Sequence, residues 1–241
     1  MTGGWIRGPV LGIETTGRLT GAAIFADGRL LAESAHDARA QSQETLLAQA
    51  DRLLRALGLA PRDLVRIGVA LGPGSFTGVR VGLASARALA LGADLPLACI
   101  PSHEALAWPL CDLGRTLVLL TGLRRGEVFL EAGRWEGHAW RALLPGAGVP
   151  VGDVGARLAA VPGAGSFLFL GEAAGLPDLS GELAGLGQAV TEPLVSARRP
   201  AVIACLAARP DALVVRGVGL DAVEPLYLRA ADARRPGTSD G

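Results

Sequence analysis

Short apolar runs separated by turn residues predict three strands at the start of the chain. The strands are expected at Val10–Thr16, Thr20–Ala26 and Arg29–Ala35. Asp27-Gly28, between the second and third runs, is typical of a tight hairpin turn. The second and third strands should therefore pair antiparallel.

A helical repeat of leucine and alanine follows over Ser42–Leu57, where Ser42 can cap the helix and Gly58 ends it. Next come a strand at Ile67–Leu71, a glycine-rich turn, a second helix at about Phe76–Leu91 and a strand at Leu95–Ile100. The order is three antiparallel strands, helix, strand, helix, strand. This is the ribonuclease-H-like arrangement of an α/β fold.

The second half repeats this order more weakly. Its expected elements are strands at 116–122, 127–132, 139–144 and 166–170, with helices at 151–161 and 195–209. Pro200 must kink or restart the last helix, and the glycine-rich stretch 163–187 is expected to be irregular. We therefore expect two ribonuclease-H-like domains, 10–101 and 102–221, each a mixed sheet with helices. A C-terminal segment, 222–241, should be disordered over its last ten residues, 232–241.

Composition limits the classes of function. The chain has 241 residues, 50% of them hydrophobic, and its 23 basic residues balance 23 acidic ones. Every basic residue is arginine, so a Schiff-base lysine and a Walker A lysine are excluded. Balanced charge provides no electrostatic footprint for independent binding of nucleic acid. Neither a signal peptide nor a membrane-length apolar run is found, so a cytoplasmic protein without membrane contact is expected.

The metal-ligating residue types are dispersed. The three cysteines form no CxxC pair, and the three histidines, His36, His103 and His138, form no HxxxH or HExxH motif. No metal site is therefore expected. His103-Glu104 is expected to start a helix as a solvated first turn.

The most distinctive stretch joins the buried strand at Ile67–Leu71 to the second helix. It consists of Gly72, Pro73, Gly74, Ser75, Phe76, Thr77 and Gly78. Its spacing fits neither Walker A nor GxGxxG, and Ser75 does not stand in a GxSxG elbow. Ser75 and Thr77 are expected to cap the helix or shape the turn. The stretch is thus interpreted as structural, or as the remnant of a nucleotide loop.

A polar tip follows the first strand, at Glu14, Thr15, Thr16 and Gly17. A carboxylate and hydroxyls there could face a nucleotide's phosphates or magnesium. The residue types alone favour the simpler interpretation, a polar strand end with an ordinary turn.

Small residues recur every fourth position in the second helix, at Gly78, Gly82, Ala86 and Ala90. Such a stripe permits close approach, either of the chain's own sheet or of a helix of another subunit. The only charges along most of this helix are Arg80 and Arg87, which favours an interface. The expected partner-binding residues are Leu46, Ala50, Leu53, Arg80, Gly82, Ala86 and Ala90.

Two segments resemble the TsaB (formerly YeaZ) family of accessory subunits in bacterial tRNA threonylcarbamoyladenosine synthesis. They are VLGIETT at 10–16 and IGVALGPGSFTGVRVGLA at 67–84. Weaker similarities lie at 104–106, at 124–129 and in the segment PLYLR at 225–229. The similarities follow the family's order over most of the chain.

The resemblance implies a fold related to actin, hexokinase and the sugar kinases. It implies a non-catalytic scaffold without a cofactor of its own, paired with a TsaD-like enzyme through helices of the first domain. A TsaE-like ATPase is a further implied partner. Free of the TsaD-like subunit, the chain should form a homodimer through the same surface, because an uncovered apolar patch is costly. The complex transfers a threonylcarbamoyl group to an adenosine next to the anticodon, so tRNA is reached only through the complex.

The chain departs from the family pattern at three places. Glu14 stands where the family usually has aspartate, residues 41–44 read QSQE where His-Ser-Glu is common, and Thr121 replaces an aspartate. The changes at Glu14 and Thr121 weaken the case for nucleotide binding and do not affect the case for partner binding, which rests on helix faces. The alternative is an independent nucleotide-binding enzyme of the sugar-kinase or ATPase type. A metallopeptidase role is opposed by the missing histidine motif.

Overall fold

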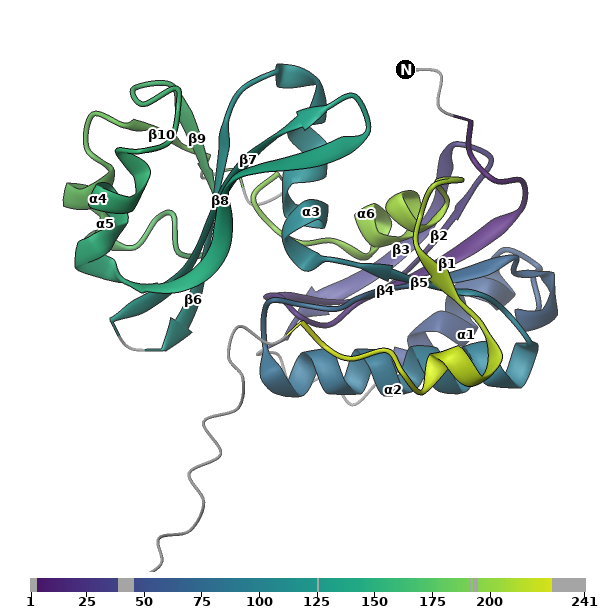
Figure 1. Ribbon diagram of the computed structural model, residues 1–241. Helices are drawn as coiled ribbons and strands as arrows, with labels where there is room; N and C mark the ends of the chain where they lie inside the picture. Colours follow the sequence, from purple (N-terminus) through teal and green to yellow (C-terminus); the bar gives the residue numbers. More distant parts are fainter. Residues whose placement is uncertain (1–3, 39–45, 125, 191, 193–194, 227–241) are drawn as a thin grey trace, which may run out of the picture.

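Two sheets organise the chain (Figure 1). The computed structural model describes residues 4–38, 46–124, 126–190, 192 and 195–226. The first sheet has six strands in the spatial order β11-β5-β4-β1-β2-β3, and the second has five in the order β10-β9-β6-β7-β8. The expected helix start at Ser42, the departure at 41–44 and the expected disorder at 232–241 lie outside the described residues.

The elements follow the expected order, with additions in the second half. The strands are β1 (Pro9–Glu14), β2 (Leu19–Ala26), β3 (Arg29–Asp37), β4 (Arg66–Ala70), β5 (Leu97–Ile100), β6 (Leu117–Arg124), β7 (Glu127–Glu136), β8 (Ala139–Pro150), β9 (Phe167–Leu170), β10 (Gly187–Ala189) and β11 (Val214–Val215). The helices are α1 (Leu46–Ala56), α2 (Phe76–Ala93), α3 (Ser102–Ala107), α4 (Val154–Leu158), α5 (Pro177–Leu183) and α6 (Pro200–Ala207). Short 3₁₀ turns are η1 (Pro61–Asp63), η2 (Trp108–Leu113), η3 (Val151–Asp153) and η4 (Gly217–Leu220).

The two sheets share one strand topology. In the first, β1, β2 and β3 are antiparallel neighbours, and β4 and β5 continue parallel on the other side of β1. Asp27 and Gly28 both have positive φ, as a two-residue hairpin turn requires. The second sheet repeats the pattern with β6, β7 and β8 antiparallel and β9 and β10 parallel. The chain is an α/β protein with two ribonuclease-H-like sheets, as expected.

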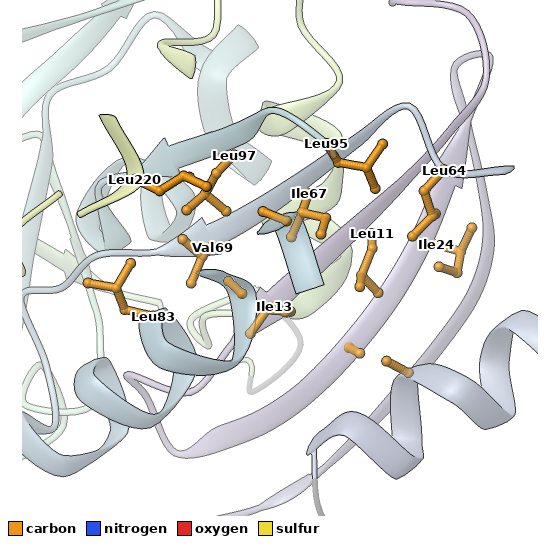
Figure 2. Close-up of a cluster of buried hydrophobic side chains, with 14 of the residues drawn as sticks. Leu11, Ile13, Ile24, Leu64, Ile67, Val69, Leu83, Leu95, Leu97 and Leu220 are labelled. Carbon is orange, nitrogen blue, oxygen red and sulfur yellow. The ribbon is translucent and has the colours of Figure 1, made fainter. Parts of the chain in front are cut away.

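Helices α1 and α2 cover one face of the first sheet, and the main core lies between them and the strands (Figure 1). Figure 2 shows side chains of β1, β4 and β5, including Leu11, Ile67 and Leu97, pointing into this layer. Each is at most 1% exposed. Burying one such side chain contributes about 1.5–3 kcal/mol. Leu220 of η4 joins the same core from the C-terminal part of the chain.

Helix α6 covers the opposite face of the first sheet (Figure 1). Gly12 and Gly68 make the close approach possible, since a Cβ at Gly12 would lie 2.3 Å from the backbone nitrogen of Ala204. Strand β11 extends the same sheet by pairing with β5. Chain order predicts that both elements belong to 102–221, with the second domain. The structure places them on the first sheet, because the apolar second face of that sheet has to be covered.

Two expected elements of the second half differ in the structure. Helix α6 begins at Pro200 and not at Val195, because proline suits a first helical turn and cannot extend a helix through its position. Helix α5 lies within 163–187, which was expected to be irregular. Its residues Leu179 and Leu183 are four apart and buried in the second core, but flanking glycines obscure this short repeat.

Candidate functional site

The glycine-rich turn links β4 to α2, and its first glycine needs a left-handed backbone, with φ of +94° at Gly72. Ser75 is the N-cap of α2, and its hydroxyl accepts a hydrogen bond of 3.1 Å from the backbone of Gly78. The expected capping role of Ser75 is confirmed. Gly72 and Pro73 are buried, whereas Ser75, Phe76 and Thr77 are exposed.

The loop after β1 packs directly into this turn. The backbone N–H of Ser75 donates to the carbonyl of Thr16 at 2.8 Å, and the Thr15 hydroxyl donates to the carbonyl of Gly78 at 2.7 Å. A Cβ at Gly78 would lie 1.9 Å from the Thr15 carbonyl oxygen, and one at Gly82 would lie 2.2 Å from the Thr15 hydroxyl. These glycines accommodate a loop of the same chain, and the N–H groups of Ser75 and Gly78 are already bonded.

Glu14 organises the loop from inside the protein. Its carboxylate oxygen Oε1 accepts hydrogen bonds from the backbone and hydroxyl of Thr16 at 2.5 and 2.6 Å, and from Gly17 at 3.2 Å. Burial raises the pKa of Glu14, although the nearby Arg198 charge and these bonds lower it. Glu14 is 0% exposed, and Thr15 and Thr16 are also buried. The polar residues after β1 thus form a turn in which the Glu14 carboxylate is hydrogen-bonded by the turn's own backbone and hydroxyl groups.

A cleft of about 990 Å³ lies between the two lobes of the chain, each of which is built around one of the two sheets. From the first lobe it is lined by 16–19 and by Gly74, Ser75 and Phe76. From the second lobe it is lined by 121–123, 171–172 and 196–198. Among the described residues, no group of three or more histidine, cysteine, aspartate or glutamate side chains could hold a metal ion.

Arg198 links the two sides of this cleft. No pattern in the sequence indicated a role for it. The residue is buried, with 4% of its surface exposed. Its Nη1 donates to the carbonyl of Pro73 at 2.7 Å, and its Nη2 donates to Glu172 at 2.5 Å. The partners lie 125 and 26 residues away in sequence, so no local pattern could reveal them.

A second polar cluster lies between α3 and the second sheet. His103 stacks on Phe129, and its Nε2 lies 3.3 Å from Oε2 of Glu131. Burial lowers the pKa of His103 to about 4 and raises the pKa of Glu131 to about 7. Near pH 6 the two groups are therefore neutral neighbours and not an ion pair. The expectation of a solvated first turn at His103-Glu104 is wrong, because α3 is enclosed between the two sheets.

The predicted partner-binding residues fall on two sides of their helices. Ala50 and Leu53 of α1, like Gly82, Ala86 and Ala90 of α2, are buried against the chain's own core. The small-residue stripe therefore packs on the chain's own loop and sheet, which is the first of its two interpretations. Leu46 is half-buried and Arg80 is exposed.

The outward side of α2 carries a different, apolar stripe. Phe76, Val81 and Leu91 are 55%, 50% and 58% exposed. Ala84 and Ala88 lie between them on the same exposed side. The Arg80 guanidinium lies 3.9 Å from the centre of the Phe76 ring. No residue of α2 is acidic. From Val81 to Leu91 the apolar positions recur at every third or fourth residue, a spacing that could have identified this side of the helix.

A family model described as "TsaD: tRNA N6-adenosine threonylcarbamoyltransferase" matches residues 34–134. The chain is 28% identical over 144 residues to "tRNA threonylcarbamoyladenosine biosynthesis protein TsaB" of Bacillus subtilis, covering 60% of this chain and 63% of that protein. The protein of the same name from Escherichia coli is 31% identical over 144 residues, covering 56% and 62%. The similarity thus spans somewhat more than six-tenths of each relative.

A solved structure extends the likeness in fold to almost the whole chain. "YeaZ from Pseudomonas aeruginosa" superposes with a TM-score of 0.70 over 92% of this chain and 100% of that chain, at 22% identity. Within the described residues, no helix is both long enough and apolar enough to cross a membrane.

Proposed function

We propose that this chain, which belongs to the TsaB (YeaZ) family, is the accessory subunit of a tRNA threonylcarbamoyladenosine synthesis complex. In this proposal the chain does not catalyse the transfer of the threonylcarbamoyl group. It acts as a scaffold that pairs with a TsaD-like catalytic subunit, and it reaches tRNA only through the complex. It works in the cytoplasm, with a TsaE-like ATPase as a further member, and it forms a homodimer when the TsaD-like subunit is absent.

The exposed apolar stripe of α2 carries the proposal. Val81, Ala84, Ala88 and Leu91 stand outward on a helix that has no acidic residue. An apolar helix face of this kind is costly in water and is typical of a surface that another protein covers. Leu47 on α1 is 45% exposed and adds to the apolar surface of the same layer. Two related folds meeting through such equivalent helices would form a pseudo-two-fold interface.

One substitution on each lobe tests the docking surface. Val81→Asp places a charge at a position that is 50% exposed, and Leu176→Asp places the same charge at a position in the second lobe that is 42% exposed. Both variants should fold, as judged by circular dichroism. Val81→Asp should fail to co-purify with a TsaD-like subunit and should lower the mass measured by light scattering. Leu176→Asp should keep both associations. A folded Val81→Asp variant that associates normally would refute this surface.

The interdomain cleft is the observation that favours the alternative, an independent nucleotide-using enzyme. Against it stand the bonded N–H groups of the glycine turn and the enclosed Glu14. The purified chain should therefore show no ATP hydrolysis and no tRNA modification without its partners. Robust turnover by the chain alone, abolished by Glu14→Ala, would favour the enzyme.

A further inference from the structure

The side chain of Arg198 is a buried positive charge at the interdomain cleft, and the fold fixes its position. Arg198 lies between the loop after β1 and the glycine turn, where glycines leave it room. A Cβ at Gly17 would lie 2.9 Å from its Nε, and a Cβ at Gly74 would lie 2.8 Å from its Nη1. The Nε of Arg198 is buried and has no hydrogen-bond partner among the described residues. The guanidinium thus keeps one donor that no described group of the protein satisfies.

One carboxylate of the second lobe is bound by Arg198 and lies near the loop after β1. Glu172 follows β9, and its Oε1 accepts the 2.5 Å hydrogen bond from Nη2 of Arg198. The backbone N–H of Arg18, in the loop after β1, lies near enough to Glu172 to lower the pKa of its carboxyl. A guanidinium beside a backbone N–H is a donor set that suits a phosphate as well as a carboxylate.

Glu172 and Arg198 differ in their access to solvent. The Arg198 side chain is 3% exposed, whereas the Glu172 side chain is 34% exposed and lines the cleft. Burial raises the pKa of Glu172, but the Arg198 charge and the hydrogen bonds outweigh it, so the pKa lies below its ordinary value. Glu172 is therefore an anion at neutral pH, seated where a soluble anion could otherwise enter.

The other charged groups around the cleft do not take the place of Glu172 beside Arg198. Glu14 also faces Arg198, but burial raises its pKa and its Oε1 is bonded within its own loop. At the rim, the Arg18 side chain pairs with Asp37 at 2.8 Å. Glu172 is thus the accessible carboxylate that neutralises Arg198 within the described part of the cleft.

We propose that Glu172 is a built-in anion that occupies a phosphate-type site in the interdomain cleft. With Glu172 in place, its carboxylate occupies Nη2 of Arg198 and fills the space near the Arg18 backbone, and inorganic phosphate does not bind there. Removal of the carboxylate exposes a site for one phosphoryl group. This inference goes beyond the scaffold role and does not depend on any partner.

The test compares phosphate binding by the full chain and its Glu172→Ala and Glu172→Gln variants. Isothermal titration calorimetry with inorganic phosphate measures the affinity, and circular dichroism checks folding. Glu172→Ala should bind phosphate about tenfold or more tightly than the unmodified chain, because a charge-assisted donor set is vacated. Glu172→Gln, which removes the charge but keeps the size, should show a smaller gain.

The chain offers a matched control. Glu136 accepts hydrogen bonds from both Arg134 and Arg141, but on the exposed surface of the second lobe. Glu136→Ala also frees arginine side chains and should not gain phosphate affinity, because solvent and salt screen an exposed site.

Three outcomes would overturn the proposal. The first is a pair of folded Glu172 variants that bind phosphate no better than the unmodified chain. The second is an equal gain in Glu136→Ala, which would indicate a general attraction to positive charge. If Glu172→Ala is too unstable for calorimetry, phosphate should raise its melting temperature more than that of the unmodified chain. Equal shifts would be the third contrary outcome.

Discussion

Replacing Gly78 with alanine tests the tight contact between the loop after β1 and helix α2. A Cβ at this position would lie 1.9 Å from the carbonyl oxygen of Thr15, far inside van der Waals contact. The obstructing atom belongs to the backbone, so no rotation of a side chain can relieve the clash. Either the loop or the helix start must move.

Gly92→Ala in the same helix is the control, because a Cβ there would meet nothing within 4 Å. Both substitutions gain the helix propensity of alanine, about 0.8–1 kcal/mol relative to glycine. Only Gly78→Ala adds the cost of overpacking, about 1–3 kcal/mol. The two variants should therefore differ by about 1–3 kcal/mol in the free energy of unfolding, with Gly92→Ala at or above the unmodified chain.

Urea denaturation followed by circular dichroism gives this difference, and calorimetry gives a second reading. For a chain of this size, 1 kcal/mol corresponds to a shift of about 2–4 °C in melting temperature. Equal stability of the two alanine variants would refute the close packing of the loop on α2. It would also restore the hypothesis that the glycine turn binds a ligand.

Two other substitutions test the cap and the buried acid–histidine pair. Ser75→Ala should lower the free energy of unfolding by about 0.5–2 kcal/mol, because the N-cap bond to Gly78 is lost, and an unchanged urea midpoint would contradict this. Burial raises the pKa of Glu131 to about 7, so the folded state retains a proton that the unfolded chain releases, and stability falls as pH rises toward 7. Burial lowers the pKa of His103 to about 4, so its contribution rises between pH 4 and the ordinary value of 6.5 and opposes that of Glu131. In Glu131→Gln the melting temperature should therefore rise more steeply between pH 4 and pH 6.5 than it does in the unmodified chain. An unaltered pH profile would count against the buried His103–Glu131 pair.

The sequence by itself determined the strand and helix order of the first lobe. Alternating apolar runs, the Asp27-Gly28 turn and the Ser75 cap are local signals, because each depends on neighbours within a few positions. The same signals predicted a repeated arrangement in the second half, where they are weaker. The glycine stretch also carried the family resemblance, since its spacing is distinctive.

Only the tertiary structure decided which sides of the helices are exposed and what holds the lobes together. Small-residue spacing predicts close approach but not the identity of the neighbour, so it could not show that Gly82 faces Thr15. Helix α6 and strand β11 joined the first sheet because its second face and edge had to be completed by distant segments. Arg198 met Pro73 and Glu172 through contacts 125 and 26 residues away. Such pairings arise when the sheets close around shared polar groups, and no short stretch of sequence contains both partners.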